Sequence, residues 1–290
     1  MIFNASRFVS VTNIIRRSIS SEPCLKELIV EPLTGSDSGI LVLGLNRVKQ
    51  KNALSKNLLG SLENAIEKAN NDNSVRVVII RSHVSKVFCA GADLKERLTM
   101  TESEVRIFVN RIRKFMTSLE NVRTPVISAI DGAALGGGLE MALATDIRVA
   151  SENAKIGLVE TSLAIIPGAG GTQRLPRIIG IPRAKELIFT SRILTGKEAK
   201  EYGIVNHCVP FNEEDDGAYQ KSLEIARLIL SNGPIGVRMS KLAINKGCDT
   251  SLAGGCLIEE LCYSQVIPTK DRIEGLKAFQ EKRRPVYKGE

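Results

Sequence analysis

Residues 125–150, PVISAIDGAALGGGLEMALATDIRVA, hold the pattern that decides the fold. The apolar runs 125–130 (PVISAI) and 146–150 (DIRVA) each have the length of a buried strand. Between them, three consecutive glycines at 136–138 open a helical stretch that carries Glu140 in its first turn. A strand, a glycine-rich turn, a helix and a second strand in this order indicate an α/β architecture.

The same alternation extends toward the N-terminus. Residues 39–46 (GILVLGLN) and 75–81 (VRVVIIR) are short apolar runs that predict two further strands. Residues 55–71 between them place apolar side chains at helical spacing, behind a serine that is a favourable N-cap. Residues 101–122 form an apolar stripe at the same spacing, and their first residues match a capping box.

The pattern changes near residue 216. A short capped helix and a strand over 204–209 close the alternating part, and almost all of the remaining chain has helical periodicity. Proline and glycine separate the helices that we expect there, which cover 234–246, 251–266 and 269–282. The sequence therefore predicts a core followed by a helical region.

The first 21 residues, MIFNASRFVSVTNIIRRSISS, contain three arginines and several serines but no acidic residue. This composition is typical of an organelle transit peptide, and a merely disordered start is the alternative. A secretory signal is disfavoured because the segment has no continuous apolar stretch. We therefore expect a transit peptide over 1–21, a core over 22–230 and a C-terminal helical region over 231–290.

The 290 residues are 43% hydrophobic and 25% charged, as in ordinary globular proteins, and the absence of Trp predicts an aliphatic core. The net charge is +8, and without the three leader arginines 37 basic and 32 acidic residues leave +5. This mild excess suits an anionic ligand and does not by itself indicate nucleic-acid binding. No apolar run approaches the ~18–20 residues that span a bilayer, so we expect no membrane association.

The number and spacing of the cysteines and histidines disfavour disulfide bonds, a zinc site and a Ser-His-Asp triad. The six cysteines include no CxxC pair, and the chain does not resemble a small disulfide-rich scaffold, so we expect reduced thiols. His83 and His207 are the only histidines, and neither lies in a zinc-binding or Ser-His-Asp motif. We expect neither a metal site nor a redox cofactor.

Three segments carry chemistry, and the first is 87–97, VFCAGADLKER. The small residues at 90–92 allow the backbone to approach a ligand closely. Taken alone, the segment favours the plainer interpretation, a strand-to-helix turn in which Asp93 caps the helix.

The second segment is the glycine-rich turn at 136–138. Free N–H groups and the positive end of the following helix make such a turn suitable for stabilising an anion, with Glu140 close by for proton transfer. The alternative is a tight turn in which Glu140 only favours the helix dipole. The segment does not match GxGxxG, so dinucleotide binding is disfavoured.

The third segment is 155–174, KIGLVETSLAIIPGAGGTQR, in which Glu160 stands among apolar residues. A carboxyl group in this setting is either a solvated loop residue or a buried group with a raised pKa. The GAGGTQR stretch lacks the Gly-Lys-Ser/Thr ending of a phosphate-binding loop.

In this order and spacing, the three segments together resemble the crotonase (enoyl-CoA hydratase/isomerase) family, from about Leu28 to Glu290. The resemblance implies a spiral of ββα units with a C-terminal helical region that packs in trimers or hexamers. It also implies a mitochondrial matrix enzyme that uses no cofactor beyond the CoA carried by its substrate. The stretches IPTKDRIEGLKAFQEKR and GLVETSLAIIPGAGGTQRLPR carry much of it.

The same resemblance implies the site residues. Ala92 and Gly137 match the two N–H donors of the family's oxyanion hole, and Glu140 and Glu160 match the two acids of its hydratases. By this match Glu160 exchanges the proton at C2 of the enoyl thioester, and Glu140 activates the water. The residues expected around the CoA thioester are Ala90, Ala92, Asp93, Leu94, Lys95 and Gly137.

The substrate and two other functional classes stay open at this stage. Within the family the chain is most similar to hydratases of leucine degradation, whose substrate carries a second carboxylate, and a general short-chain enoyl-CoA hydratase is the alternative. RNA binding has been attached to a lysine-rich helix in related proteins. The matching segment here, 51–76, has four basic and three acidic residues and no aromatic one, so RNA is weakly supported. A catalytically dead scaffold is disfavoured because both acids are retained.

Overall fold

The structure is a computed structural model that describes residues 26–290, so the expected transit peptide over 1–21 lies outside the described residues. A six-stranded sheet with the strand order β1-β2-β3-β5-β7-β10 forms its centre. Strands β1 and β2 pair antiparallel, and all the other pairs in this sheet are parallel. Its strands are β1 (Leu28–Pro32), β2 (Ile40–Leu45), β3 (Val77–Ser82), β5 (Val126–Ile130), β7 (Ile147–Ser151) and β10 (His207–Val209).

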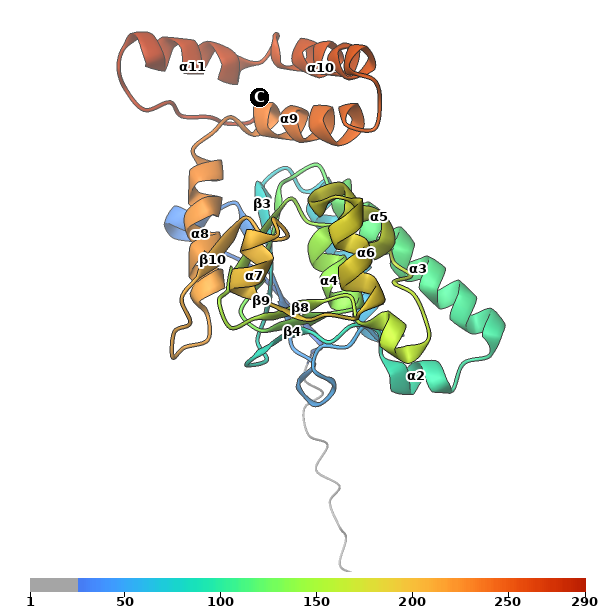
Figure 1. Ribbon diagram of the computed structural model, residues 1–290. Coiled ribbons are helices and arrows are strands. Elements are labelled where there is room, and N and C mark those ends of the chain that lie inside the picture. Colours follow the sequence, from blue (N-terminus) through green and yellow to red (C-terminus); the bar gives the residue numbers. More distant parts are fainter. Residues whose placement is uncertain (1–25) are drawn as a thin grey trace, which may run out of the picture.

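Helices pack on both faces of this sheet (Figure 1). Alternate residues of β2 and β3 enter two separate apolar clusters, as expected when side chains point to opposite faces of a strand. Helix α8 (Gly217–Leu230) covers one face, and α1 (Lys56–Asn71), α3 (Glu102–Glu120) and the second sheet lie on the other. The core is largely aliphatic, as expected, and its buried aromatic side chains are Phe88, Phe108, Phe115 and Tyr219.

The second sheet is small and has the order β4-β6-β8-β9. Strands β4, β6 and β8 run parallel, and β9 is antiparallel to β8. Parallel neighbours end at the same edge of a sheet, so the loops that follow β4, β6 and β8 lie together. The strands are β4 (Val87–Cys89), β6 (Ala133–Leu135), β8 (Lys155–Gly157) and β9 (Leu194–Thr195).

The expected helix starts are confirmed at atomic level. Ser55 caps α1 by accepting a hydrogen bond from the N–H of Leu58, and Thr101 with Glu104 forms a complete capping box at α3. The other helices are α2 (Leu94–Leu98), α4 (Gly137–Leu143), α5 (Gly171–Ile179), α6 (Ile181–Phe189), α7 (Gly196–Glu201), α9 (Pro234–Gly247), α10 (Leu252–Val266) and α11 (Lys270–Gln280).

Helices α9, α10 and α11 project away from the core (Figure 1). The expected division between residues 230 and 231 falls between α8 and α9. Lys241 of α9 ties this region to the core, because its ammonium group donates to Asp146 at 2.7 Å and to the carbonyl of Thr124 at 3.1 Å. Among residues 26–290 we find no helix that is both long and apolar enough to cross a membrane.

Candidate active site

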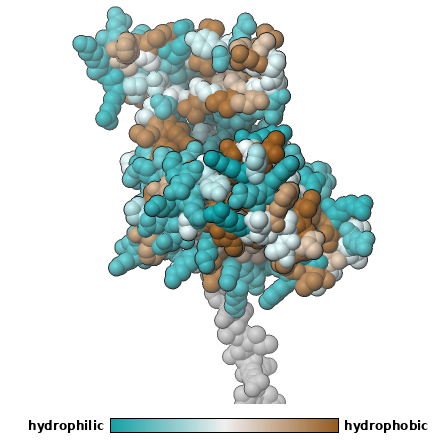
Figure 2. Space-filling model, viewed as in Figure 1, coloured by the Kyte–Doolittle hydropathy of each residue, from teal (hydrophilic) through white to brown (hydrophobic). Residues whose placement is uncertain are grey.

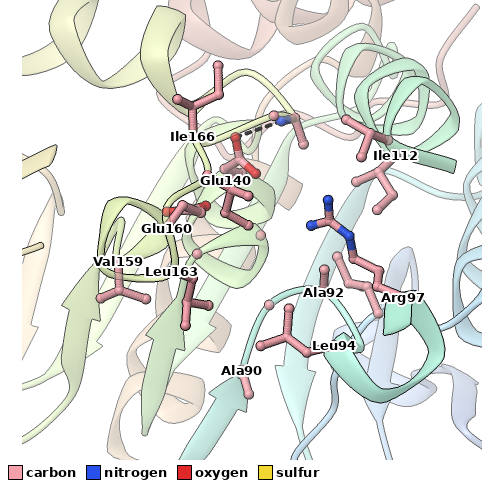
Figure 3. Close-up of a pocket in the computed structure, with 18 of the residues that line it drawn as sticks. Ala90, Ala92, Leu94, Arg97, Ile112, Glu140, Val159, Glu160, Leu163 and Ile166 are labelled. Atoms are coloured by element: carbon pink, nitrogen blue, oxygen red, sulfur yellow. Dashed lines mark hydrogen bonds between the residues drawn. The ribbon is translucent and has the colours of Figure 1, made fainter. Parts of the chain in front are cut away.

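A cavity of about 460 Å³ lies at one edge of the small sheet, where three loops supply much of its lining (Figure 3). The loop after β4 brings Ala90 and Ala92, the loop after β6 brings Gly136 and Gly137, and the segment after β8 brings Glu160. The three segments singled out in the sequence therefore meet at one place because their strands are parallel neighbours.

The two expected oxyanion donors lie close together. A methyl group placed on Gly137 would lie 3.4 Å from the backbone nitrogen of Ala92, and one on Gly91 would lie 3.2 Å from the nitrogen of Gly137. Neither the N–H of Ala92 nor that of Gly137 donates a hydrogen bond within the described chain. Both donors are thus available to an oxygen atom in the cavity.

Gly136 fits its position for two reasons. Its backbone φ of +51° lies in the left-handed region, which residues other than glycine rarely adopt. A methyl group there would also lie 3.2 Å from Oε1 of Glu160. At Gly136 the backbone therefore lies against the Glu160 carboxyl group. The same residue is the N-cap of α4, whose first helical turn carries Glu140.

Glu140 is buried and held by the backbone. Its Oε1 accepts hydrogen bonds from the N–H groups of Ala169 and Gly171, each at 2.8 Å, and a dashed line in Figure 3 marks a hydrogen bond to this carboxylate. Burial raises the pKa of Glu140, while the two N–H donors and the nearby Arg174 and Arg113 oppose the rise. The pKa of this carboxyl group is raised overall, and the two N–H donors and the two arginines limit the rise by stabilising its charged form.

Glu160 has a different environment. It is buried, and its Oε2 has no hydrogen-bond partner in the described part of the chain. Burial, and then the charge of Glu140, raise the pKa of Glu160 to about 7. Of the two possibilities that the sequence left open, the structure places Glu160 in the buried one. Two neighbouring carboxyl groups in such different environments, both with a raised pKa, suit general acid–base chemistry.

The raised pKa of Glu160 predicts a pH-dependent cost in stability. When the pKa of a carboxyl group is higher in the folded than in the unfolded protein, protonation favours the folded state. This contribution to the free energy of unfolding is fully present below the unfolded pKa of ~4.3 and is lost as the pH rises through the folded pKa. That folded pKa is about 7. We expect Glu160→Gln to be more stable than the wild type at about pH 8 and to lose this advantage at about pH 5.

Urea unfolding of both proteins at the two pH values, at equal protein concentration, measures the difference. If the difference in the free energy of unfolding between Glu160→Gln and the wild type does not change with pH, the buried environment with a raised pKa assigned to Glu160 is wrong.

The remaining expected ligand residues divide into two groups. Ala90 and Leu94 line the cavity together with Ala92. Asp93 is buried and caps α2 through hydrogen bonds from the N–H groups of Lys95 and Glu96, both at 3.1 Å. Its carboxylate also accepts from Arg47 at 2.6 Å, so it stabilises the turn. Lys95 is exposed on α2 and is not part of the cavity lining, so its role in CoA binding stays a prediction.

Two arginines of the cavity lining were not identified from the sequence. Arg97 points from α2 into the cavity (Figure 3), and no hydrogen bond or ion pair joins its guanidinium group to another residue of 26–290. Arg113 of α3 also lines the cavity and donates from Nε to the carbonyl of Gly168 at 2.9 Å. The LKER motif contained Arg97, but no sequence signal distinguished it from a solvated helix residue.

Most of the other lining is apolar and suits a short acyl chain. It consists of Leu54, Val109, Ile112, Val159, Leu163, Ile165 and Ile166. Within the described residues, no group of three or more His, Cys, Asp or Glu side chains is arranged to hold a metal ion. That the protein works without a metal or other cofactor stays a prediction.

Comparisons with known proteins bear on this geometry. The family described as Enoyl-CoA hydratase/isomerase matches residues 35–290. Human methylglutaconyl-CoA hydratase, mitochondrial, is 56% identical over 276 residues, which are 95% of this chain and 81% of that protein. Human enoyl-CoA hydratase domain-containing protein 2, mitochondrial, is 50% identical over 91% of this chain and 90% of its own length.

The fold is shared with solved structures as well. The crystal structure of an enoyl-CoA hydratase from Bacillus anthracis superposes with a TM-score of 0.87 at 51% identity, covering 91% of this chain and all of that one (100%). An enoyl-CoA hydratase from Mycobacterium tuberculosis superposes with a TM-score of 0.80 at 30% identity, over 91% of this chain and 100% of its own.

Proposed function

Because the chain belongs to the enoyl-CoA hydratase/isomerase (crotonase) family, we propose that it is a hydratase acting on 3-methylglutaconyl-CoA. The crotonase fold expected from the sequence is confirmed by this membership and by the solved hydratase structures. The observation that carries the proposed chemistry is the pair of buried carboxyl groups, Glu140 and Glu160, beside two free backbone N–H donors.

The reaction begins with polarisation of the substrate. The thioester carbonyl oxygen accepts hydrogen bonds from the N–H groups of Ala92 and Gly137, which makes C3 of the enoyl group electrophilic. Negative charge develops on this oxygen as the enolate forms, so the two donors stabilise the transition state more than the ground state. Each donor in comparable sites contributes ~3–4 kcal/mol.

The two carboxyl groups divide the proton transfers. Glu140, whose charged form is stabilised by two N–H donors, accepts a proton from water as the water oxygen bonds to C3. Glu160, with a pKa of about 7, retains its proton in a large fraction of molecules at neutral pH and delivers it to C2. One water is consumed: its oxygen bonds to C3 and its proton moves to Glu140, while the proton of Glu160 moves to C2. Transfer of one proton from Glu140 to Glu160 then restores the starting state for the next turnover.

Arg97 supports 3-methylglutaconyl-CoA as the substrate. The acyl group of this substrate ends in a second carboxylate, which would be costly to bury in an apolar cavity without a partner. The Arg97 guanidinium group points into the cavity and has no hydrogen-bond or ion-pair partner among residues 26–290, and arginine binds carboxylates through two parallel hydrogen bonds. A general short-chain substrate such as crotonyl-CoA would leave this cation without a partner.

We expect 3-methylglutaconyl-CoA to be hydrated with a kcat/KM at least ~10-fold higher than that of crotonyl-CoA, because a charge-assisted hydrogen bond commonly contributes ~1.5–3 kcal/mol. Arg97→Gln should remove most of this preference while leaving crotonyl-CoA turnover largely intact. Competition between the two thioesters in one reaction measures the ratio directly. Arg106→Gln, an exposed arginine of α3 outside the cavity, is the matched control.

If the wild type consumes crotonyl-CoA first, the protein is a general short-chain hydratase. If it prefers 3-methylglutaconyl-CoA and Arg97→Gln keeps that preference, the distal carboxylate is bound elsewhere.

The surface supports assembly with further copies of the chain. Enzymes of this family are typically oligomeric, and we propose a trimer or hexamer. In α10 only Cys262 is buried, while Leu252, Leu257 and Leu261 are exposed. Apolar side chains gather on the C-terminal helices and on the side of the molecule near α2 and α3 (Figure 2). Sedimentation analysis tests this, and a stable monomer would refute it.

We further propose a mitochondrial matrix location, supported by the mitochondrial names of the relatives and by the arginine-rich start of the sequence. Native protein that begins at Met1 would contradict removal of a transit peptide.

A further inference from the structure

The loop that holds Glu140 is itself held by two arginines. The N–H groups of Ala169 and Gly171 both donate to Oε1 of Glu140 at 2.8 Å, so the conformation of residues 168–171 fixes this carboxylate. Ala169 and Gly171 lie 29 and 31 residues after Glu140 in the chain, so tertiary packing brings them together with this carboxylate.

Arg113 acts on one of these donors directly. Its Nε donates to the carbonyl of Gly168 at 2.9 Å, and this carbonyl belongs to the same peptide group as the N–H of Ala169. A cation at the oxygen end of a peptide group polarises it and strengthens the hydrogen bond that its N–H donates. Arg113, one peptide group and Glu140 therefore form a continuous line of hydrogen bonds.

Arg174 of α5 holds the next peptide group. It donates from Nη1 to the carbonyl of Ala169 at 3.2 Å, and its guanidinium group pairs with Glu120 of α3 at 2.7 Å. Gly170 between the two N–H donors has a φ of +111°, and a methyl group there would lie only 2.1 Å from Nη1 of Arg174. The loop is thus shaped to let this arginine lie against its backbone.

We propose that Arg113 and Arg174 are positioning residues of the hydration reaction, which orient Glu140 and keep it charged by holding the peptide groups of residues 168–171. The inference rests on the proposed hydratase function. Neither arginine hydrogen-bonds to Glu140 itself. Arg113 also lines the cavity, and direct substrate binding by its guanidinium group is the competing explanation.

The expected consequence is a change in pH dependence. The charges of Arg174 and Arg113 both lower the pKa of Glu140 against the effect of burial. The other charged groups facing Glu140 are Glu160, whose own pKa responds to it, and Arg97 across the cavity. Removing Arg113 or Arg174 should let the pKa of Glu140 rise, so that the acidic limb of kcat/KM moves to higher pH.

The test compares Arg113→Gln and Arg174→Gln with the wild type over a range of pH. We expect the acidic limb to move up by at least ~0.5 pH unit, since one opposite charge commonly lowers a carboxyl pKa by ~1–3 units. We also expect kcat to fall ~10-fold or more, because displaced catalytic groups cost up to ~10²-fold, with KM nearly unchanged. Arg113→Lys, which keeps the charge, should restore most of the pH profile.

Matched controls lie on the same helices. Arg111→Gln removes an arginine of α3 that pairs with Glu63, and Arg177→Gln removes one of α5 that bonds to Gln173. Both should keep the wild-type pH profile. Arg113 is exposed, so Arg113→Gln should fold even if Arg174→Gln does not, and it then decides the outcome alone.

A wild-type pH profile in Arg113→Gln, or an effect confined to KM, would overturn the proposal and leave Arg113 as a substrate ligand or a surface residue. Infrared titration of the Glu140 carboxylate, taken as the difference from Glu140→Gln, gives its pKa without turnover. If the pKa of Glu140 shifts in Arg113→Gln but the wild type hydrates no enoyl-CoA, the proposed function is refuted, while the inference that Arg113 positions Glu140 stands.

Discussion

Replacing Glu160 by glutamine is expected to lower the rate of enoyl-CoA hydration by at least ~10²-fold, the usual contribution of a general acid or base. Glutamine has nearly the same shape but cannot deliver the proton that C2 requires. The fold should be unaffected, because the ionised side chain is buried with an unpartnered Oε2 and removal of its charge relieves a cost. Steady-state kinetics with 3-methylglutaconyl-CoA, together with binding of CoA, measure both effects.

Glu140→Gln should show a loss of similar size for a different reason. The amide would keep an oxygen for the N–H donors of Ala169 and Gly171 but could not accept a proton from water. Glu214→Gln, an exposed carboxylate outside the cavity, should retain wild-type activity. Wild-type turnover in either catalytic variant would refute the two-carboxylate mechanism.

The second large effect is expected for Gly137→Ala. The added methyl group would lie 3.4 Å from the nitrogen of Ala92 and 3.5 Å from a methyl carbon of Leu54, so it fits without displacing the protein. It would, however, occupy space between the two oxyanion donors that the thioester oxygen needs. Loss of one such donor commonly lowers kcat by ~10²–10³-fold, and we expect a decrease of this size.

Gly236→Ala is the matched control for this substitution. Gly236 lies near the start of α9, and a methyl group there has no neighbour within 4 Å among residues 26–290. The control should keep both activity and thermal stability. If Gly137→Ala lowers only stability, or if it stays as active as the control, the two N–H groups do not form the oxyanion site.

Much of the core could be predicted because its signals are local. The apolar runs of β2, β3, β5 and β7 and the capped starts of α1 and α3 lie where the sequence predicted them. The three-residue strands β4, β6 and β8 are too short to show periodicity. The small sheet that assembles the cavity was therefore not predicted from pattern, and the meeting of its loops was expected only from the family resemblance.

The site could be predicted where a residue type was unusual for its surroundings. Glu160 was conspicuous as an acid among apolar residues, and Glu140 followed three consecutive glycines. Arg97 and Arg113 were not, because arginine on an amphipathic helix is ordinarily solvated. Whether these two side chains point into the cavity depends on how α2 and α3 pack around it, and this packing cannot be inferred from residue spacing in the sequence.

The central claim is that this chain adds water to an enoyl-CoA through Glu140 and Glu160, and the family name also covers isomerases. Turnover of 3-methylglutaconyl-CoA in ¹⁸O-labelled water, with product analysis by mass spectrometry, tests it most directly. We predict one labelled oxygen at C3 of the product of the wild type and no detectable incorporation in the Glu140→Gln/Glu160→Gln double variant. A product with a shifted double bond and no label, or labelled product from the double variant, would contradict the account.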